Sequence, residues 1–149
     1  MSTLHFEIIG RFQGPEDANK LLYTPLPDQL TFQRTRVYET ECDGNAEAAR
    51  AYMLRVLADP ISQQVNETGA PALPNALFRI DYGMKPGSLD LEKEAILTNY
   101  RGRTGLPFTL KTLRITQRVY VFGEGEGDAL AARFAKDVCN PAIHSWTIA

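Results

Sequence analysis

The sequence has few of the residues that build reactive or metal-binding centres. It contains two cysteines, two histidines and one tryptophan among 149 residues. Cys42 and Cys139 lie far apart and lack the spacing of metal ligands, so we expect neither a disulfide framework nor a metal site, and a reducing cytoplasm fits best. His5 and His144 have no Cys, Asp or Glu at ligand spacing, and we expect both to be structural.

Signatures of nucleophilic catalysis are also absent. Cys42 lies between Glu41 and Asp43, and two flanking carboxylates disfavour the thiolate that a catalytic cysteine needs. The chain has no nucleophile-elbow sequence. We therefore expect no catalytic residue, no metal and no cofactor of its own.

Neither sign of charge is in large excess, and no long apolar run occurs. The formal net charge is -2, whereas a general nucleic-acid binder is usually strongly basic. No stretch approaches the length of a membrane span, and no basic region followed by an apolar run marks a signal peptide. Hydrophobic residues make up 44% of the chain and charged residues 23%, which is typical of a globular domain. We expect a soluble cytoplasmic protein that binds neither nucleic acid nor a membrane.

What the sequence does contain is an internal repeat. The segments Arg36–Ser62 and Arg118–Ser145 both read as Arg-Val-Tyr, an acidic turn with glycine, an Ala-Ala-Arg helix, then Asp-Pro or Asn-Pro and an isoleucine. The arginines are 82 positions apart (118 − 36) and the prolines Pro60 and Pro141 are 81 apart (141 − 60). Chance rarely aligns four features in one order, so we infer a tandem duplication.

A segment with several structure-breaking residues separates the two copies. Gly69, Pro71 and Pro74 lie within it. Each half is small for an independent core, so we expect the halves to pack on each other. The predicted organisation is a divergent first unit at 1–65, a linker at 66–77 and a second unit at 78–149.

Hydrophobic periodicity predicts the elements of the second half. Residues 78–85 alternate apolar and polar side chains as a strand does, and residues 107–122 are β-rich and fit one bent strand or two. Leu130, Phe134 and Val138 share one face of a helix. The first half follows a reduced form of this plan. The predicted class is α+β, with two similar β-α-β-β-α-β units in tandem, antiparallel sheets with helices on one face, and a pseudo-twofold axis.

Ser88 and Asp128 are the expected caps of the two helices in this half. The turn before Asp128 reads Gly-Glu-Gly-Glu-Gly and suggests a phosphate loop. A P-loop, however, needs Lys and then Ser or Thr after its last glycine, and here the acidic residues would repel a phosphate. The corresponding turn in the first copy of the repeat has one glycine, Gly44. We interpret the run as a solvated turn whose acidic residues favour a helix N-terminus.

One long stretch carries positive charge alone. From Thr98 to Tyr120 there is no Asp or Glu. Arg114 and Arg118 share strand parity, so both can point to the same face. The stretch forms either a solvated sheet face or a contact for an acidic partner surface or a nucleotide phosphate. The candidate contact residues are Arg101, Arg103, Lys111, Arg114 and Arg118.

A second motif, Lys85-Pro86-Gly87-Ser88-Leu89-Asp90, follows the predicted strand at 78–85. It resembles the opening of PurS, the small subunit of phosphoribosylformylglycinamidine synthase, where Lys-Pro-Gly, a hydrophobic residue and Leu-Asp lead into a helix. The family usually continues Pro-Gln-Gly, and this chain departs from it. The resemblance covers nearly all of 78–149, whereas in the first half only 36–62 aligns. The matching motif residues are Lys85, Pro86, Gly87, Leu89 and Asp90.

The resemblance implies a function without catalytic residues. The PurS family belongs to a complex that converts formylglycinamide ribonucleotide, ATP and glutamine into formylglycinamidine ribonucleotide. PurS-type modules hold the synthase and glutaminase subunits together and help enclose the ammonia route. They act as dimers, so a covalent tandem implies a pseudo-dimer, and further homo-oligomerisation stays open. The chain is then either a stand-alone subunit or the N-terminal domain of a longer synthase.

Two other hypotheses remain open from the sequence. The first is a regulatory α+β module that binds a small ligand between its two halves. The second is a small enzyme that uses His144 or Cys139, which the missing signatures disfavour.

Overall fold

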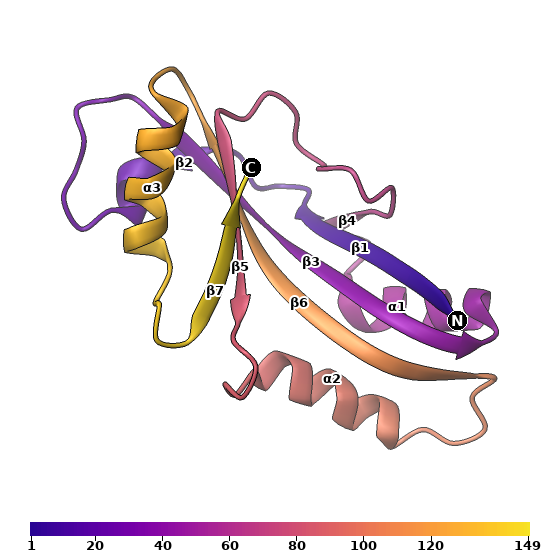
Figure 1. Ribbon diagram of the computed structural model, residues 1–149. Coiled ribbons are helices and arrows are strands. Elements are labelled where there is room, and N and C mark those ends of the chain that lie inside the picture. Colours follow the sequence, from indigo (N-terminus) through magenta and orange to yellow (C-terminus); the bar gives the residue numbers. More distant parts are fainter.

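One twisted antiparallel sheet runs through the whole molecule, with helices packed along it (Figure 1). The computed structural model describes residues 1–149. No helix combines the length and the apolar composition that crossing a membrane requires. The elements in chain order are β1 (Ser2–Gly10), β2 (Glu16–Asp17), the 3-10 helix η1 (Ala18–Leu21), β3 (Thr31–Gly44), α1 (Ala46–Leu57), β4 (Gln63–Asn66), β5 (Phe78–Met84), α2 (Leu91–Arg101), β6 (Phe108–Phe122), α3 (Gly127–Val138) and β7 (His144–Ile148).

The two halves of the chain meet at the centre of this sheet. The strand order is β4-β1-β3-β6-β5-β7, with β2 paired to β3 outside that path. The central ladder between β3 and β6 runs from Thr31 opposite Phe122 to Gly44 opposite Phe108. The α+β class is confirmed, and a single continuous sheet takes the place of the separate sheets that the sequence predicted.

Residues 107–122 form one long strand rather than two. Strand β6 is paired with β3 along its whole length, so no turn interrupts it. A register shift between Glu41 and Cys42 bends the pair. The second half therefore runs β-α-β-α-β, one strand fewer than predicted.

The helices cover one face of the sheet. Side chains alternate between faces, and those on the helix face form two hydrophobic clusters at opposite ends of the long strands. Each large apolar side chain buried there stabilises the fold by about 1.5–3 kcal/mol. The cluster under α1 and α2 includes Phe6, Tyr38, Met53, Ile96 and Ile115. The cluster under α3 and η1 includes Phe32, Phe78, Ile80, Val119 and Phe134.

The two copies of Arg-Val-Tyr do not occupy matching places in the central ladder. Arg36 pairs with Gln117, and Arg118 pairs with Thr35 on the neighbouring rung. Neighbouring rungs point to opposite faces, so the two arginines do too. The sequence repeat aligns Arg36 with Arg118, whereas the sheet pairs Arg36 with Gln117. The two alignments therefore differ by one residue.

The first half ends in a strand, and the linker follows it. Residues 63–66 form β4, which pairs with β1 at one edge of the sheet. The linker then leads to β5 across the face opposite the helices. There the backbone N–H of Ala72 donates hydrogen bonds to Glu7 Oε1 and to the Tyr120 hydroxyl, both at 3.1 Å. This crossing covers the centre of the second face.

Helix α2 begins two residues later than predicted. Asp90 is its N-cap and accepts a hydrogen bond from the Lys93 N–H at 3.1 Å. Ser88 belongs to the preceding turn, since its N–H donates to the Lys85 carbonyl at 3.0 Å. Helix α3 begins at Gly127, so Asp128 lies in its first turn rather than at the cap. Its acidic charge there still favours the helix N-terminus.

Gly44, which ends β3, is expected to tolerate no side chain. Its φ is +94°, and a Cβ would lie 2.6 Å from the Pro107 carbonyl oxygen. We predict that Gly44→Ala lowers the free energy of unfolding by about 1–3 kcal/mol for the backbone conformation alone, and by more because of the contact. Urea denaturation measures this. Gly105→Ala is the control, because its φ is +72° but nothing lies within 4 Å. Equal losses in both variants would show that the Pro107 contact contributes nothing.

Candidate functional site

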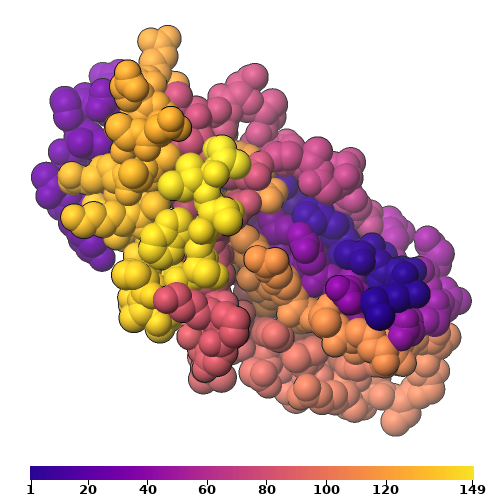
Figure 2. All heavy atoms as spheres, viewed as in Figure 1, coloured from indigo at the N-terminus to yellow at the C-terminus, as the bar shows by residue number.

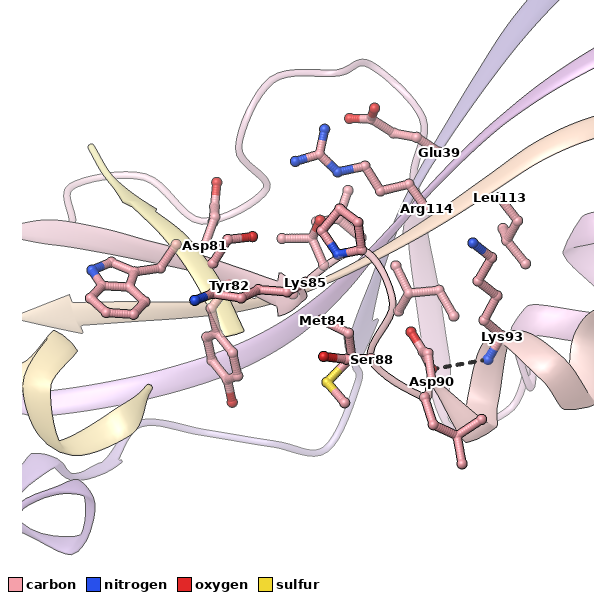
Figure 3. A pocket seen from close by; sticks show the side chains of 18 of the residues that line it. Glu39, Asp81, Tyr82, Met84, Lys85, Ser88, Asp90, Lys93, Leu113 and Arg114 are labelled. Atoms are coloured by element: carbon pink, nitrogen blue, oxygen red, sulfur yellow. Dashed lines mark hydrogen bonds between the residues drawn. The ribbon is translucent and has the colours of Figure 1, made fainter. Parts of the chain in front are cut away.

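A pocket opens where β5 separates from β6. The two strands pair only from Phe78 to Tyr82, and β6 then continues without a strand partner on that side. Gly83 lies at the separation, and a Cβ on it would be 3.0 Å from the Ile115 carbonyl oxygen. Glycine therefore lets the two backbones pass closely before they part. The pocket has a volume of about 650 Å³ (Figure 3).

The family-motif residues form one wall of this pocket. Lys85, Pro86, Gly87, Leu89 and Asp90 all line it. Gly87 has a φ of +88°, which permits the sharp turn between β5 and α2. In Figure 2 the C-terminal residues, in yellow, lie on the surface beside the segment that carries this turn.

The positively charged stretch does not form one surface. Arg114 and Arg118 both line the pocket, in agreement with their shared strand parity. Arg101 and Arg103 are exposed elsewhere, at and just after the end of α2, and Lys111 lies 3.6 Å from Asp43 Oδ2. From the first half of the chain, the pocket takes two residues of β3, Val37 and Glu39.

Arg118 is buried in a cluster of charges and is not available as part of an exposed patch. Its side chain bonds Glu7 Oε1 at 2.8 Å through Nη1 and both carboxylate oxygens of Asp81, at 2.8 and 3.2 Å. Glu7, which is 0% exposed, also accepts hydrogen bonds from Thr35 at 2.7 Å and from Tyr120 at 2.5 Å. These five residues, the Arg118 cluster, join β1, β3, β6 and β5 on the face opposite the helices.

The cluster raises the pKa of two of its members, Arg118 and Tyr120. Burial by itself lowers the pKa of Arg118, but the hydrogen bonds and charge of Asp81 and the charge of Glu7 outweigh it and raise that pKa. Burial raises the pKa of Tyr120, and so do its hydrogen bond to Glu7 and the charge of Glu7. The guanidinium therefore stays charged and the phenol stays neutral.

A second polar group attaches α2 to the sheet. The Tyr38 hydroxyl donates a hydrogen bond to Glu92 Oε1, and Arg36 Nη1 lies 3.2 Å from the same oxygen. Burial, the Glu92 hydrogen bond and the Glu92 charge raise the pKa of Tyr38 to about 12, against the opposing effect of Arg36. Ile96 is the one buried residue of α2, so the apolar contact between α2 and the sheet is small. The polar contacts of Glu92 add to it.

Neither histidine forms part of a reactive group. His144 Nδ1 accepts a hydrogen bond from the Asn140 N–H at 2.9 Å, and its ring packs on Tyr82. His5 Nδ1 lies 3.5 Å from Glu39, while its Nε2 is buried without a partner. No group of three or more His, Cys, Asp or Glu residues is placed to hold a metal ion.

Both cysteines are buried. Burial raises the pKa of Cys139 to about 11, so its thiol stays protonated at neutral pH. A protonated, buried thiol is a poor nucleophile, which further disfavours an enzyme that uses Cys139.

Backbone conformation accounts for two glycines of the Gly-Glu-Gly-Glu-Gly turn. Gly123 and Gly125 have φ values of +136° and +154°, which L side chains rarely adopt. The atom nearest to an added Cβ would be the end of a leucine side chain, Leu30 Cδ2 at 2.5 Å for Gly123 and Leu130 Cδ1 at 2.7 Å for Gly125.

Sequence reasoning did not identify the acidic partners of Arg118. Glu7 interrupts an apolar run in β1, and Asp81 lies on a strand face that alternation assigned to solvent. The detectable signal was the isolated acid Glu7 in an otherwise apolar part of β1. Lys93 was also missed, because nothing in its neighbourhood distinguishes it from a solvated helix residue.

Comparisons of the chain with protein-family models, with curated proteins and with solved structures gave no match. Any function must therefore be inferred from the geometry of the site and of the sheet.

We predict that Arg118→Met lowers the free energy of unfolding by about 3–5 kcal/mol, since it leaves Glu7 buried without a cation. Adding Glu7→Gln should recover part of that loss by removing the uncompensated charge. A double-mutant cycle in urea measures the coupling. Arg114→Met, on the same strand but exposed, should change the stability by less than about 0.5 kcal/mol. Additive effects of the Glu7 and Arg118 changes would contradict the cluster.

The pKa of Tyr38 predicts a loss of stability at high pH. A tyrosine ordinarily titrates near 10, and Tyr38 titrates near 12 in the folded chain. The folded state then holds the proton more tightly, so this contribution to stability is complete below pH 10 and is lost as the pH rises from about 10 to about 12. Ultraviolet titration of tyrosine absorbance should show a late change at high pH. Tyr38→Phe should remove one tyrosine's share of that change and leave the share of Tyr120, whose pKa is also raised, while Glu92→Gln should move the Tyr38 share to lower pH. A late change of unaltered size in Tyr38→Phe would refute the assignment.

Proposed function

We propose that the chain is a non-catalytic assembly module of phosphoribosylformylglycinamidine synthase, built from two PurS-like units fused in tandem. Such a module bridges the synthase and glutaminase parts and helps enclose the ammonia route. The observation that carries the proposal is the strand order β4-β1-β3-β6-β5-β7, in which each half supplies three consecutive strands and the halves join through β3 and β6, with the short β2 outside this order. A fused dimer has this arrangement.

The ladder registers support the duplication. Matching Arg36 with Gln117, its partner on the central rung, gives a shift of 81 positions (117 − 36). The same shift takes the first residue of β4, Gln63, onto the first residue of β7, His144 (144 − 63). It also takes the first residue of α1 onto the first residue of α3. Two pairs of elements, β4 with β7 and α1 with α3, thus share the shift that this rung defines.

Glu7 and Asp81 are counterparts under this scheme. Glu7 pairs with Val37 and Asp81 pairs with Arg118, and Val37 and Arg118 differ by the same 81 positions (118 − 37). In the proposed duplication, a twofold axis through the Arg36–Gln117 rung would relate the two carboxylates that bind Arg118. The linker then acts in place of self-association, because it keeps the two units at a high effective concentration.

The exposed cations offer a partner surface in this proposal. Arg101 and Arg103 are exposed and have no hydrogen-bonded or ionic partner within the chain. Contact with an acidic protein surface would therefore break no interaction inside the chain. Rim charges of this kind act chiefly on the rate and selectivity of association.

We predict that the tagged full chain captures the synthase and the glutaminase from native cell extract. The double charge reversal Arg101→Glu/Arg103→Glu should weaken capture and reduce its salt dependence, because it removes the positive patch. Arg55→Glu, on the exposed side of α1, is the control for a charge reversal outside this surface, and each single variant, Arg101→Glu or Arg103→Glu, is compared with it. Normal glutamine-dependent synthase activity in a strain that lacks this chain would refute the proposed function.

A further inference from the structure

Strand β7 forms one edge of the sheet, and its outer side is open. It pairs with β5 on one side and with no strand on the other. Every residue of β7 after His144 is exposed, and the large apolar side chains of Trp146 and Ile148 are 37% and 44% exposed. In Figure 2 the atoms of this segment, in yellow, lie at the surface with no other part of the chain over them. The outer side of β7 is therefore free to meet another strand.

The pairing with β5 determines which backbone groups of β7 point outward. The Ala149 N–H donates to the Arg79 carbonyl at 2.9 Å, and the Ala149 carbonyl accepts from the Arg79 N–H at 2.8 Å. Hydrogen-bonding direction alternates along an antiparallel strand, so the odd-numbered residues of β7 point their N–H and C=O groups towards β5. Trp146 and Ile148 therefore each present a free donor and a free acceptor at the outer edge.

This edge carries no charge that would keep a second strand away. Natural edge strands are commonly protected by charged side chains, by proline or by a covering segment. Residues 142–149 contain no Asp, Glu, Lys, Arg or Pro. The opposite edge, β4, is followed directly by Glu67, to which Arg50 donates hydrogen bonds at 2.7 and 2.8 Å. Of the two edges, β7 is thus the one that lacks charge.

We propose that the occupant of this edge is the β7 strand of a second copy of the chain, paired antiparallel about a twofold axis at Thr147. In this register Trp146 of one copy lies opposite Ile148 of the other, so every free N–H of these residues meets a free C=O. A twofold axis at Trp146 would instead need the N–H of His144, which already donates to the Asn140 carbonyl at 2.7 Å.

The side chains also match in this pairing. Trp146 and Ile148 lie on the same face of β7, so the indole of each copy packs on a β-branched side chain of the other. On the opposite face the two copies of Thr147 lie side by side, and such threonine pairs stabilise sheets. Because the edge is uncharged, self-pairing brings no like charges together, whereas complementary charge would select a partner of another kind. A twofold pairing is closed at two copies.

This association is separate from the proposed assembly role. It involves the β7 edge, whereas Arg101 and Arg103 lie at and just after the end of α2. Self-association is measured on the purified chain, and capture of partners is measured in cell extract. Failure of either proposal therefore leaves the other to be judged by its own experiment.

The experiment measures the mass and the tryptophan emission of the purified full chain against its concentration. Sedimentation velocity from about 1 μM to about 1 mM covers the dissociation constants of a small interface. We expect the mass of one chain at the lower end and of two chains at the upper end. Trp146 is the one tryptophan, so its emission should shift to shorter wavelength as association buries it.

Two substitutions test the edge and leave its hydrogen bonds to β5 in place. Ile148→Pro removes an outward N–H, and Trp146→Lys adds a charge to the edge. Each should weaken association about tenfold or more, because the change occurs twice at a twofold interface. Gln64→Lys makes the same change in charge on an exposed residue of β4 and should associate as the unaltered chain does. Melting temperatures show whether each variant is folded.

A cysteine crosslink tests the register. Two copies of Thr147→Cys would place their Cα atoms about 4.5 Å apart, within reach of a disulfide. Ser145→Cys is the control, because it is exposed on the same strand face but would lie about 13 Å along the strand from its twin. Cys42 and Cys139 are buried and do not compete. Oxidation should therefore crosslink Thr147→Cys and leave Ser145→Cys single.

Three results would overturn the proposal. The first is a chain that stays single at about 1 mM, whether or not it binds a strand of another protein. The second is association that neither Ile148→Pro nor Trp146→Lys weakens, which would place the interface elsewhere. The third is equal crosslinking of Thr147→Cys and Ser145→Cys, which would show that the strands have no fixed register.

Discussion

The pairing of β3 with β6 is the constraint on which the rest of the structure depends. It is the one ladder that joins the two halves of the chain, and it extends along 14 residues of β3. Because side chains alternate along a strand, a slip of one residue would turn the apolar face of each half away from the helices. The clusters under α1 and under α3 share this ladder. The register at the centre therefore determines both cores at once.

The ion pairs of the Arg118 cluster also disfavour a shift in the register of β3 and β6. Glu7 from the first half and Asp81 from the second both bind one guanidinium, and Glu7 is completely buried. A shifted register would separate these groups and leave a carboxylate in an apolar environment, which is far more costly than a lost contact between exposed ions. The linker completes the arrangement, since the Ala72 N–H donates to Glu7 and Tyr120. The segment that connects the two halves thus also closes the second face of the sheet.

The sequence predicted the helices and strands better than it predicted how the strands pair. Alternation in β5 and spacing in α3 identified these elements because burial on one face produces a local periodicity. The length of β6 and the one-residue offset between the arginines could not be predicted, because both are set by pairing with a distant strand. The same limit applies to the site. Parity placed Arg114 and Arg118 together correctly, but the burial of Arg118 depends on Glu7, which is 111 residues away.

The pocket also results from strand pairing, here between β5 and β6. Strand β5 must pair with β6 far enough to bring Asp81 to Arg118, and it must then leave to reach the turn that starts α2. Gly83 allows the close passage, and the Lys-Pro-Gly turn with Asp90 redirects the chain into the helix. The gap that remains exposes Arg114, which lies on the same strand face as the buried Arg118. Strand β6 thus carries a buried arginine where both β3 and β5 pair with it, and an exposed arginine where only β3 does. The second neighbouring strand brings Asp81 to Arg118, and that difference in surroundings separates the roles of two equal charges.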